Sequence, residues 1–270
     1  MKMSKTLRSS AVVLIASVLL IFLWTSGSEM NTYASGSSSG LADNGLVYPL
    51  EKTADDTVSA LKTMSDGKTA LDILSAEDPD LNYLILVNGS HRMPEGWLDK
   101  GDIITSVNSR GNEFRAERAA FMAYLKLKED LEINDGIRID VDYGLRDEKE
   151  QQEVIDDLTK TYGASYAYST AAKPGYSEHH TGLALDIYLI IDGKNVYLNH
   201  EMEKYPEIWD KIHKKLPGYG FILRYPKSTS SRKTGYSYEP WHIRYTGTEA
   251  AEKIMARPAY TLEMYLKDRQ

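Results

Sequence analysis

The chain has 270 residues, of which 42% are hydrophobic and 26% are charged, a composition typical of a globular protein with one main domain. Its formal net charge of -7 and the scattered placement of its basic residues argue against nucleic acid as a partner. The chain contains no cysteine, so its stability must come from its core or from a bound ion, without disulfides.

Residues 1–34 are typical of an export signal. Lys2, Lys5 and Arg8 precede an unbroken apolar run at 11–24, and polar residues follow. The length of this run lies between that of a signal-peptide core and that of a membrane span. It therefore predicts either a cleaved signal peptide or an uncleaved membrane anchor, and both alternatives put the rest of the chain outside the cytoplasm.

A linker is expected between this segment and the globular domain. Residues 35–75 begin with SGSSSG and stay mostly polar, which is typical of a flexible connection. The domain itself is expected at 76–270. Its first strand is expected at LNYLILVN, 81–88, an apolar run that ends at Asn88-Gly89.

Hydrophobic periodicity predicts two helices and four further strands. Apolar residues recur at helical spacing in 115–131, and the segment 147–162 is charged on one side. The further strands are expected at 137–141, 184–190, 220–224 and 241–245. Because the helices are grouped before most of the strands, this order predicts an α+β fold.

The stretch SEHHTGLALDIY, residues 177–188, places a carboxylate in an apolar run soon after two adjacent histidines. An ionised Asp186 between two large aliphatic residues is costly unless it is paired or binds a metal. His179 would lie on the opposite face of a straight strand, but Gly182 can form the turn that brings it back toward Asp186. A buried His–Asp hydrogen-bonded pair would also explain these residues, so this stretch leaves both alternatives open.

A second stretch, GYSYEPWHIRY, supplies another histidine and another carboxylate. Glu239 and His242 are three positions apart with a proline between them, which excludes a helix interior. The ligands His179, Asp186 and His242 would leave an open position on an ion, and Glu239 could take a proton from a water molecule there. Two imidazoles and one carboxylate favour zinc, and one Zn2+ ion per chain is expected. The ligand types alone do not exclude manganese or iron.

The two motifs together resemble those of the zinc D-Ala-D-Ala carboxypeptidases and dipeptidases that include VanY and VanX. SEHHTGLALD fits the pattern Ser-x-His-x-x-Gly-x-Ala-x-Asp, EPWH fits Glu-x-x-His, and the similarity extends over about 84–247. The resemblance implies a hedgehog-type α+β fold, in which helices pack on one side of an antiparallel sheet. It also implies the ligands His179, Asp186 and His242, with Glu239 as the catalytic base.

Further site residues follow from the resemblance. The family has an arginine one element upstream that stabilises the carbonyl oxygen under attack. Arg146 holds that position here, although the family's preceding Ser-Gly-Tyr is replaced by Tyr-Gly-Leu. Gln151 and Ser177 are expected to contact the substrate peptide. Arg244 shares a strand face with the second-motif histidine, where it would either bind the peptide's terminal carboxylate or pair with an acidic neighbour. His180 is expected to have a structural or rim position.

The activity implied by the resemblance is that of a zinc metallopeptidase at the cell wall, a hydrolase that releases the terminal D-alanine from peptidoglycan stem peptides. The enzyme would be secreted, or attached to the membrane if the N-terminal segment is uncleaved. An L,D-carboxypeptidase acting on tetrapeptide stems is an alternative that the sequence does not separate from this activity. A non-catalytic wall-peptide-binding module is a further alternative, but it would be expected to lose Glu239 or a ligand, and none is missing.

Overall fold

The computed structural model describes residues 77–78, 81–227 and 234–270, which belong to one unit, Ser75–Gln270. The predicted export segment and linker lie outside the described residues. Within the part of the chain that the structure describes, no helix has both the length and the apolar character that a membrane span requires.

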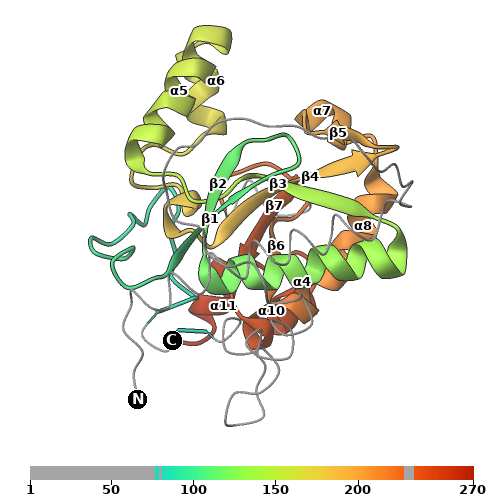
Figure 1. The fold of residues 1–270 in the computed structure, drawn as a ribbon. Coiled ribbons are helices and arrows are strands. Elements are labelled where there is room, and N and C mark those ends of the chain that lie inside the picture. Colours follow the sequence, from blue (N-terminus) through green and yellow to red (C-terminus); the bar gives the residue numbers. More distant parts are fainter. Residues whose placement is uncertain (1–76, 79–80, 228–233) are drawn as a thin grey trace, which may run out of the picture. The chain divides into compact units, whose positions relative to one another are not determined.

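Strands and helices follow one another along the described chain (Figure 1). The strands are β1 (Ile103–Val107), β2 (Glu113–Glu117), β3 (Arg138–Tyr143), β4 (Ala184–Ile191), β5 (Lys194–Val196), β6 (Phe221–Tyr225) and β7 (Glu239–Tyr245). The α-helices are α4 (Arg118–Asp135), α5 (Glu148–Tyr162), α6 (Ala164–Thr170), α7 (Asn199–Met202), α8 (Pro206–Lys215), α10 (Thr248–Met255) and α11 (Leu262–Lys267). Two 3-10 turns are η1 (Glu178–Thr181) and η2 (Leu216–Tyr219).

The main sheet has five strands, and all of its pairings are antiparallel. Its order is β3-β4-β7-β6, and β5 pairs with β4. Because β7 lies between β4 and β6, the two sequence motifs come to neighbouring strands. Asp186 on β4 is the direct cross-strand partner of His242 on β7. The predicted α+β fold with an antiparallel sheet is confirmed.

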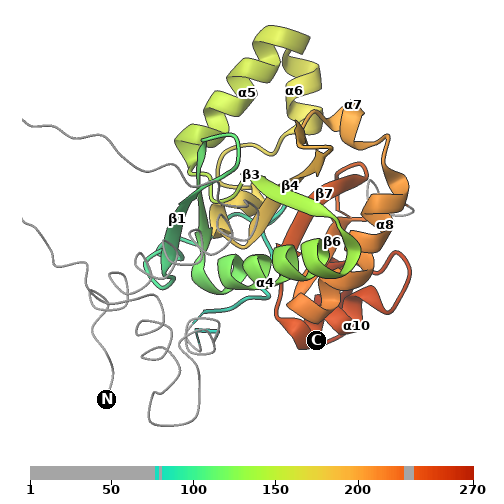
Figure 2. The same cartoon turned by 45° about the vertical axis from the view of Figure 1, so that its right-hand side comes forward.

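Helices α4, α10 and α11 lie below the sheet in Figure 1, whereas the helical hairpin of α5 and α6 projects above it (Figures 1 and 2). Leu127 and Leu131 of α4 are fully buried, and this helix contacts β3. Ile222 of β6 packs in one cluster with Ile254 of α10 and Leu262 of α11. These apolar contacts fix the sheet that carries the two motifs.

The predicted first strand at 81–88 is wrong, because this segment does not join either sheet. Its backbone carbonyls have another partner. The buried guanidinium of Arg244 donates hydrogen bonds to the carbonyl oxygens of Tyr83 and Ile85, at 3.0 and 2.9 Å. A side chain from β7 thus satisfies the acceptors that a neighbouring strand would otherwise have satisfied.

The helix predicted at 115–131 begins three residues later, at Arg118, and ends at Asp135. The reason is the unpredicted hairpin of β1 and β2, which precedes the helix. The Glu117 side chain, at the end of β2, accepts hydrogen bonds from two backbone N–H groups of the first helical turn and so caps α4. The other predicted helix and the four further strands are confirmed, with boundaries that differ by one or two residues.

Candidate active site

A pocket of about 310 Å³ is lined by residues from both sequence motifs. Seven of the eight site residues predicted from the sequence lie on its wall: Arg146, Gln151, Ser177, His179, Asp186, Glu239 and His242. Arg244 is the exception. The fold therefore brings into one cavity a set of side chains that are spread over almost a hundred positions of the chain.

His179 reaches Asp186 because the chain turns sharply between them. The turn η1 ends at Gly182, which adopts the left-handed conformation with φ of 69°. A Cβ atom at Gly182 would also come within 3.0 Å of the backbone nitrogen of Glu117. Both observations favour glycine here, and the turn predicted at this residue is confirmed.

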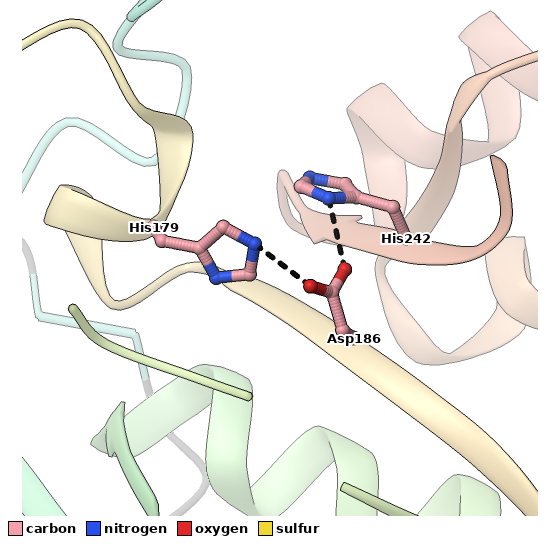
Figure 3. Close-up of side chains that lie close together, drawn as sticks. All are labelled: His179, Asp186 and His242. Carbon is pink, nitrogen blue, oxygen red and sulfur yellow. Dashed lines mark ion pairs between the residues drawn. The ribbon is translucent and has the colours of Figure 1, made fainter. Parts of the chain in front are cut away.

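Both imidazoles point at the carboxylate of Asp186 (Figure 3). Nε2 of His179 lies 3.2 Å from Oδ2, and Nδ1 of His242 lies 3.0 Å from Oδ1. One possible ligand atom from each of the three residues lies within 4.8 Å of the others. The three groups come from η1, β4 and β7, so the site depends on the tertiary fold.

The hydrogen bonding of His179 and Asp186 fits a bound cation. Nδ1 of His179 lies 2.7 Å from the carbonyl oxygen of Gly144. Because a carbonyl only accepts, Nδ1 carries the proton of the neutral ring and Nε2 turns a lone pair toward Asp186. Oδ1 of Asp186 is buried and makes no hydrogen bond. Lone pairs that face one another in this way suit a zinc ion and disfavour the alternative of a simple His–Asp hydrogen bond.

The pKa values describe the same site in the absence of an ion. Burial lowers the pKa of His179, which keeps this imidazole neutral at pH 7. Burial alone would lower the pKa of His242. The carboxylates of Asp186 and Glu178 outweigh this effect and raise the pKa to about 9.

Gly144 holds His179 in place and leaves no room for a side chain. A Cβ atom at this residue would lie 2.0 Å from the backbone oxygen of Arg115. That same oxygen accepts a hydrogen bond of 2.5 Å from the backbone nitrogen of Leu145. In the segment Tyr143-Gly144-Leu145, which stands where the family has Ser-Gly-Tyr, only the glycine is the same. The backbone partner of His179 is therefore fixed against β2.

Glu239 lies beside the three possible ligands. Its Oε2 is 3.7 Å from Nδ1 of His242, and its side chain is 22% exposed to the pocket. Burial raises the pKa of Glu239 to about 7, and the cationic neighbours His242 and Arg146 oppose this effect. A carboxylate that lies beside the possible ligand atoms, without being one of them, is placed to accept and return a proton as a general base does.

The backbone of Arg146 is held on both sides by η1. Its N–H donates to the carbonyl oxygen of His179 at 3.2 Å, and its own carbonyl oxygen accepts from Nδ1 of His180 at 2.6 Å. Nε2 of His180 in turn accepts from the backbone N–H of Gly175 at 2.9 Å, so His180 has the expected structural position. These bonds fix where the side chain of Arg146 enters the pocket.

Two polar side chains on the pocket wall keep unused hydrogen-bonding capacity. Nε of Arg146 is buried without a hydrogen-bond partner, as is Oε1 of Gln151. The amide nitrogen of Gln151 donates to the carbonyl oxygen of Ala172 at 2.7 Å, which fixes its orientation. Ser177 is 4% exposed and lines the same pocket. Buried polar atoms without partners are uncommon, and here a bound polar ligand would satisfy them.

The substrate contact predicted for Arg244 is wrong. Its side chain is fully buried outside the pocket and donates to Oε1 of Glu178 at 2.7 Å. The alternative, pairing with an acidic neighbour, is confirmed. Arg244 and His242 lie two positions apart on β7, and Glu178 of η1 contacts both side chains. Glu178, the acidic partner, was not among the predicted site residues, although it lies inside the first motif.

An aromatic wall of the pocket was likewise missed. The ring of Tyr225 lies 4.8 Å from that of His242 and 5.0 Å from that of Tyr236, measured between centroids. Tyr236 and Trp241 also line the pocket, and both belong to the stretch GYSYEPWHIRY. Tyr236 and Trp241 lie close to Glu239 and His242 in the sequence, and this closeness could have predicted that they line the pocket.

Comparisons with known proteins agree on one family. The family model of VanY, D-alanyl-D-alanine carboxypeptidase, matches residues 114–248. YodJ of Bacillus subtilis (strain 168), a candidate carboxypeptidase, is 30% identical over 237 residues, covering 80% of this chain and 82% of YodJ.

Two solved structures give the same result for the fold. One is a point mutant of the vancomycin resistance D,D-pentapeptidase VanY from a VanB-type resistance cassette, in complex with Zn(II). It is 32% identical with a TM-score of 0.56, and the match covers 68% of this chain and 98% of that one. The other is the LD-carboxypeptidase LdcB, which is 28% identical with a TM-score of 0.57, covering 71% of this chain and 92% of LdcB.

Proposed function

The chain belongs to the VanY D-alanyl-D-alanine carboxypeptidase family, and from this premise we propose that it is a zinc-dependent enzyme that removes the C-terminal D-alanine from peptidoglycan stem peptides. One observation carries the proposal. The pocket combines three facing ligand atoms with a carboxylate and a guanidinium that are not used as ligands. The apolar run at 11–24 supports a location outside the cytoplasm, where such peptides are found.

His179, Asp186 and His242 would hold the zinc ion. A zinc ion supplies Lewis-acid chemistry, which polarises the carbonyl group of the substrate and acidifies a water molecule. Glu239 would take the proton from the attacking water and return it to the amine of the departing D-alanine as the C–N bond breaks. Water is thus consumed and one amide bond is cleaved.

Arg146, Gln151 and Ser177 would position the substrate. Arg146 would donate to the carbonyl oxygen as negative charge develops there, because its Nε is buried and has no other partner. The free Oε1 of Gln151 would accept an N–H of the peptide. Ser177 would offer its hydroxyl to the peptide from the edge of η1.

The replacement of Arg146 by alanine is expected to lower kcat and kcat/KM together, by about 2.7–4 kcal/mol if it acts as one oxyanion donor. Arg146→Lys should recover little, because an ammonium group is a point charge without the planar donors of guanidinium. Steady-state kinetics on a peptide ending in D-Ala-D-Ala measures both constants. Arg92→Ala is a matched control, since Arg92 forms an exposed ion pair with Glu148 and does not line the pocket. A rise in KM at unchanged kcat would instead make Arg146 a carboxylate clamp.

The substrate is tested by mass spectrometry of synthetic stem peptides incubated with the purified protein. Release of one D-alanine from a pentapeptide ending in D-Ala-D-Ala supports the proposal. Selective cleavage of a tetrapeptide whose terminal D-alanine follows an L-residue would establish the L,D-carboxypeptidase instead. Binding of either peptide without release would indicate a binding module.

A further inference from the structure

Glu178 is a buried carboxylate that the proposed chemistry does not use. It lies in η1 next to His179, and its side chain is 1% exposed. Its Oε2 is 3.3 Å from Nε2 of His242, whereas Asp186 lies near Nδ1, the other nitrogen of that ring. Glu178 therefore contacts one proposed ligand from outside the ligand set.

Two buried arginines fix the other oxygen of this carboxylate. Oε1 of Glu178 accepts from Nε of Arg224 and from Nη1 of Arg244, each at 2.7 Å. Arg224 also donates to both carboxylate oxygens of Glu263 in α11, at 3.1 and 2.6 Å. Guanidinium groups stay protonated and only donate, so two of them on one oxygen require a carboxylate at this position. Glu178 is thus ionised and its orientation is set.

An ionised carboxylate can only accept a hydrogen bond. Nε2 of His242 must therefore carry the proton, which leaves the lone pair of the neutral ring on Nδ1, the atom that lies 3.0 Å from Asp186. We propose that Glu178 is a positioning residue that holds His242 in the tautomer able to bind the metal through Nδ1. The proposal rests on the zinc site proposed above.

Stability alone does not account for this arrangement. Glu178, Glu263, Arg224 and Arg244 form a charge-balanced network in which both arginine side chains are fully buried. Such buried ionic networks are often no more stable than apolar packing of the same volume. A carboxylate at Glu178 does give His242 an acceptor that an apolar side chain could not provide, and carboxylates of this kind orient metal-binding histidines.

Glu178→Gln tests the proposal because it nearly keeps the shape of the side chain. The amide oxygen must face the two arginines, since guanidinium only donates, so the amide NH₂ would face Nε2 of His242. That contact favours the wrong tautomer, with the proton on Nδ1. We expect zinc affinity to fall by about 10–100-fold, the usual effect of losing such a partner. Glu178→Asp should recover part of the loss, because it keeps the acceptor.

Glu263→Gln is the matched control. It removes one negative charge from the same network but does not touch His242. Zinc affinity, measured by competition with a chromogenic chelator, should stay at the level of the unmodified protein. Equal losses in Glu178→Gln and Glu263→Gln would reduce Glu178 to a structural role and overturn the proposal.

A measurement on the unmodified protein keeps the test independent of whether the variants fold. Long-range ¹H–¹⁵N spectra of histidine-labelled, zinc-loaded protein should show a proton on Nε2 of His242 and none on Nδ1. The same proton position is expected in metal-free protein at a pH at which this ring is neutral. A proton on Nδ1 would overturn the proposal. Failure of zinc to bind would refute the proposed function, while the metal-free spectrum would still report on Glu178.

Discussion

Protein from which metal has been removed by a chelator is expected to lose all peptide hydrolysis and to unfold at a lower temperature than zinc-loaded protein. Without a cation, the lone pairs of His179 and Asp186 face one another in a buried site. Because zinc binds the folded state, it should stabilise that state by about 4 kcal/mol at a concentration a thousand times its Kd. Calorimetry and a D-alanine release assay measure the two effects.

Two histidine variants make this result specific. His179→Ala should abolish both the activity and the zinc-dependent increase in Tm. His200→Ala should preserve both, because His200 is exposed and does not line the pocket. Full hydrolysis by dialysed protein in excess chelator would contradict the metal mechanism.

Glu239→Gln is expected to reduce kcat by on the order of 10²–10⁴-fold, the contribution typical of a general base. The amide has nearly the shape of the carboxylate but cannot take the proton from water. Zinc content should remain at that of the unmodified protein, because the three facing ligand atoms belong to other residues. Saturation kinetics, together with metal analysis of the same samples, measures both quantities.

The control for this prediction is a variant that keeps the carboxylate on a shorter side chain. Glu239→Asp keeps an ionisable group and should retain more activity than Glu239→Gln. A parallel loss of zinc and of activity in Glu239→Gln would identify Glu239 as a ligand. The base would then have to be sought among the other groups of the pocket.

The candidate site was predictable where its residues lie in short motifs. His179, Gly182 and Asp186 are close in the sequence, so strand alternation and one glycine turn were enough to bring them together. His242 required a second motif, and the register of β4 against β7 completes the geometry. The roles of these residues in binding and catalysis stay predictions until they are measured.

The parts that sequence reasoning missed depend on contacts between distant segments. The segment at 81–88 has the composition of a strand, but its carbonyl groups are bound by Arg244 from β7. Glu178 lies within the first motif, between Ser177 and His179. Its contacts could not be predicted because the arginines that fix it lie on β6 and β7, more than forty positions later in the chain.

The hydrogen bonds of these arginines also determine how short a fragment could be and still fold with an intact active site. Residues 114–248, the part that matches the family model, contain every proposed ligand and the base. Yet Arg244 needs the carbonyl groups of Tyr83 and Ile85, and Arg224 needs the carboxylate of Glu263. A fragment limited to the matched part would bury guanidinium groups without their acceptors, at about 1–3 kcal/mol or more for each unmet partner. The shortest fragment that keeps the active site intact is therefore longer than residues 114–248, the part by which the family is identified.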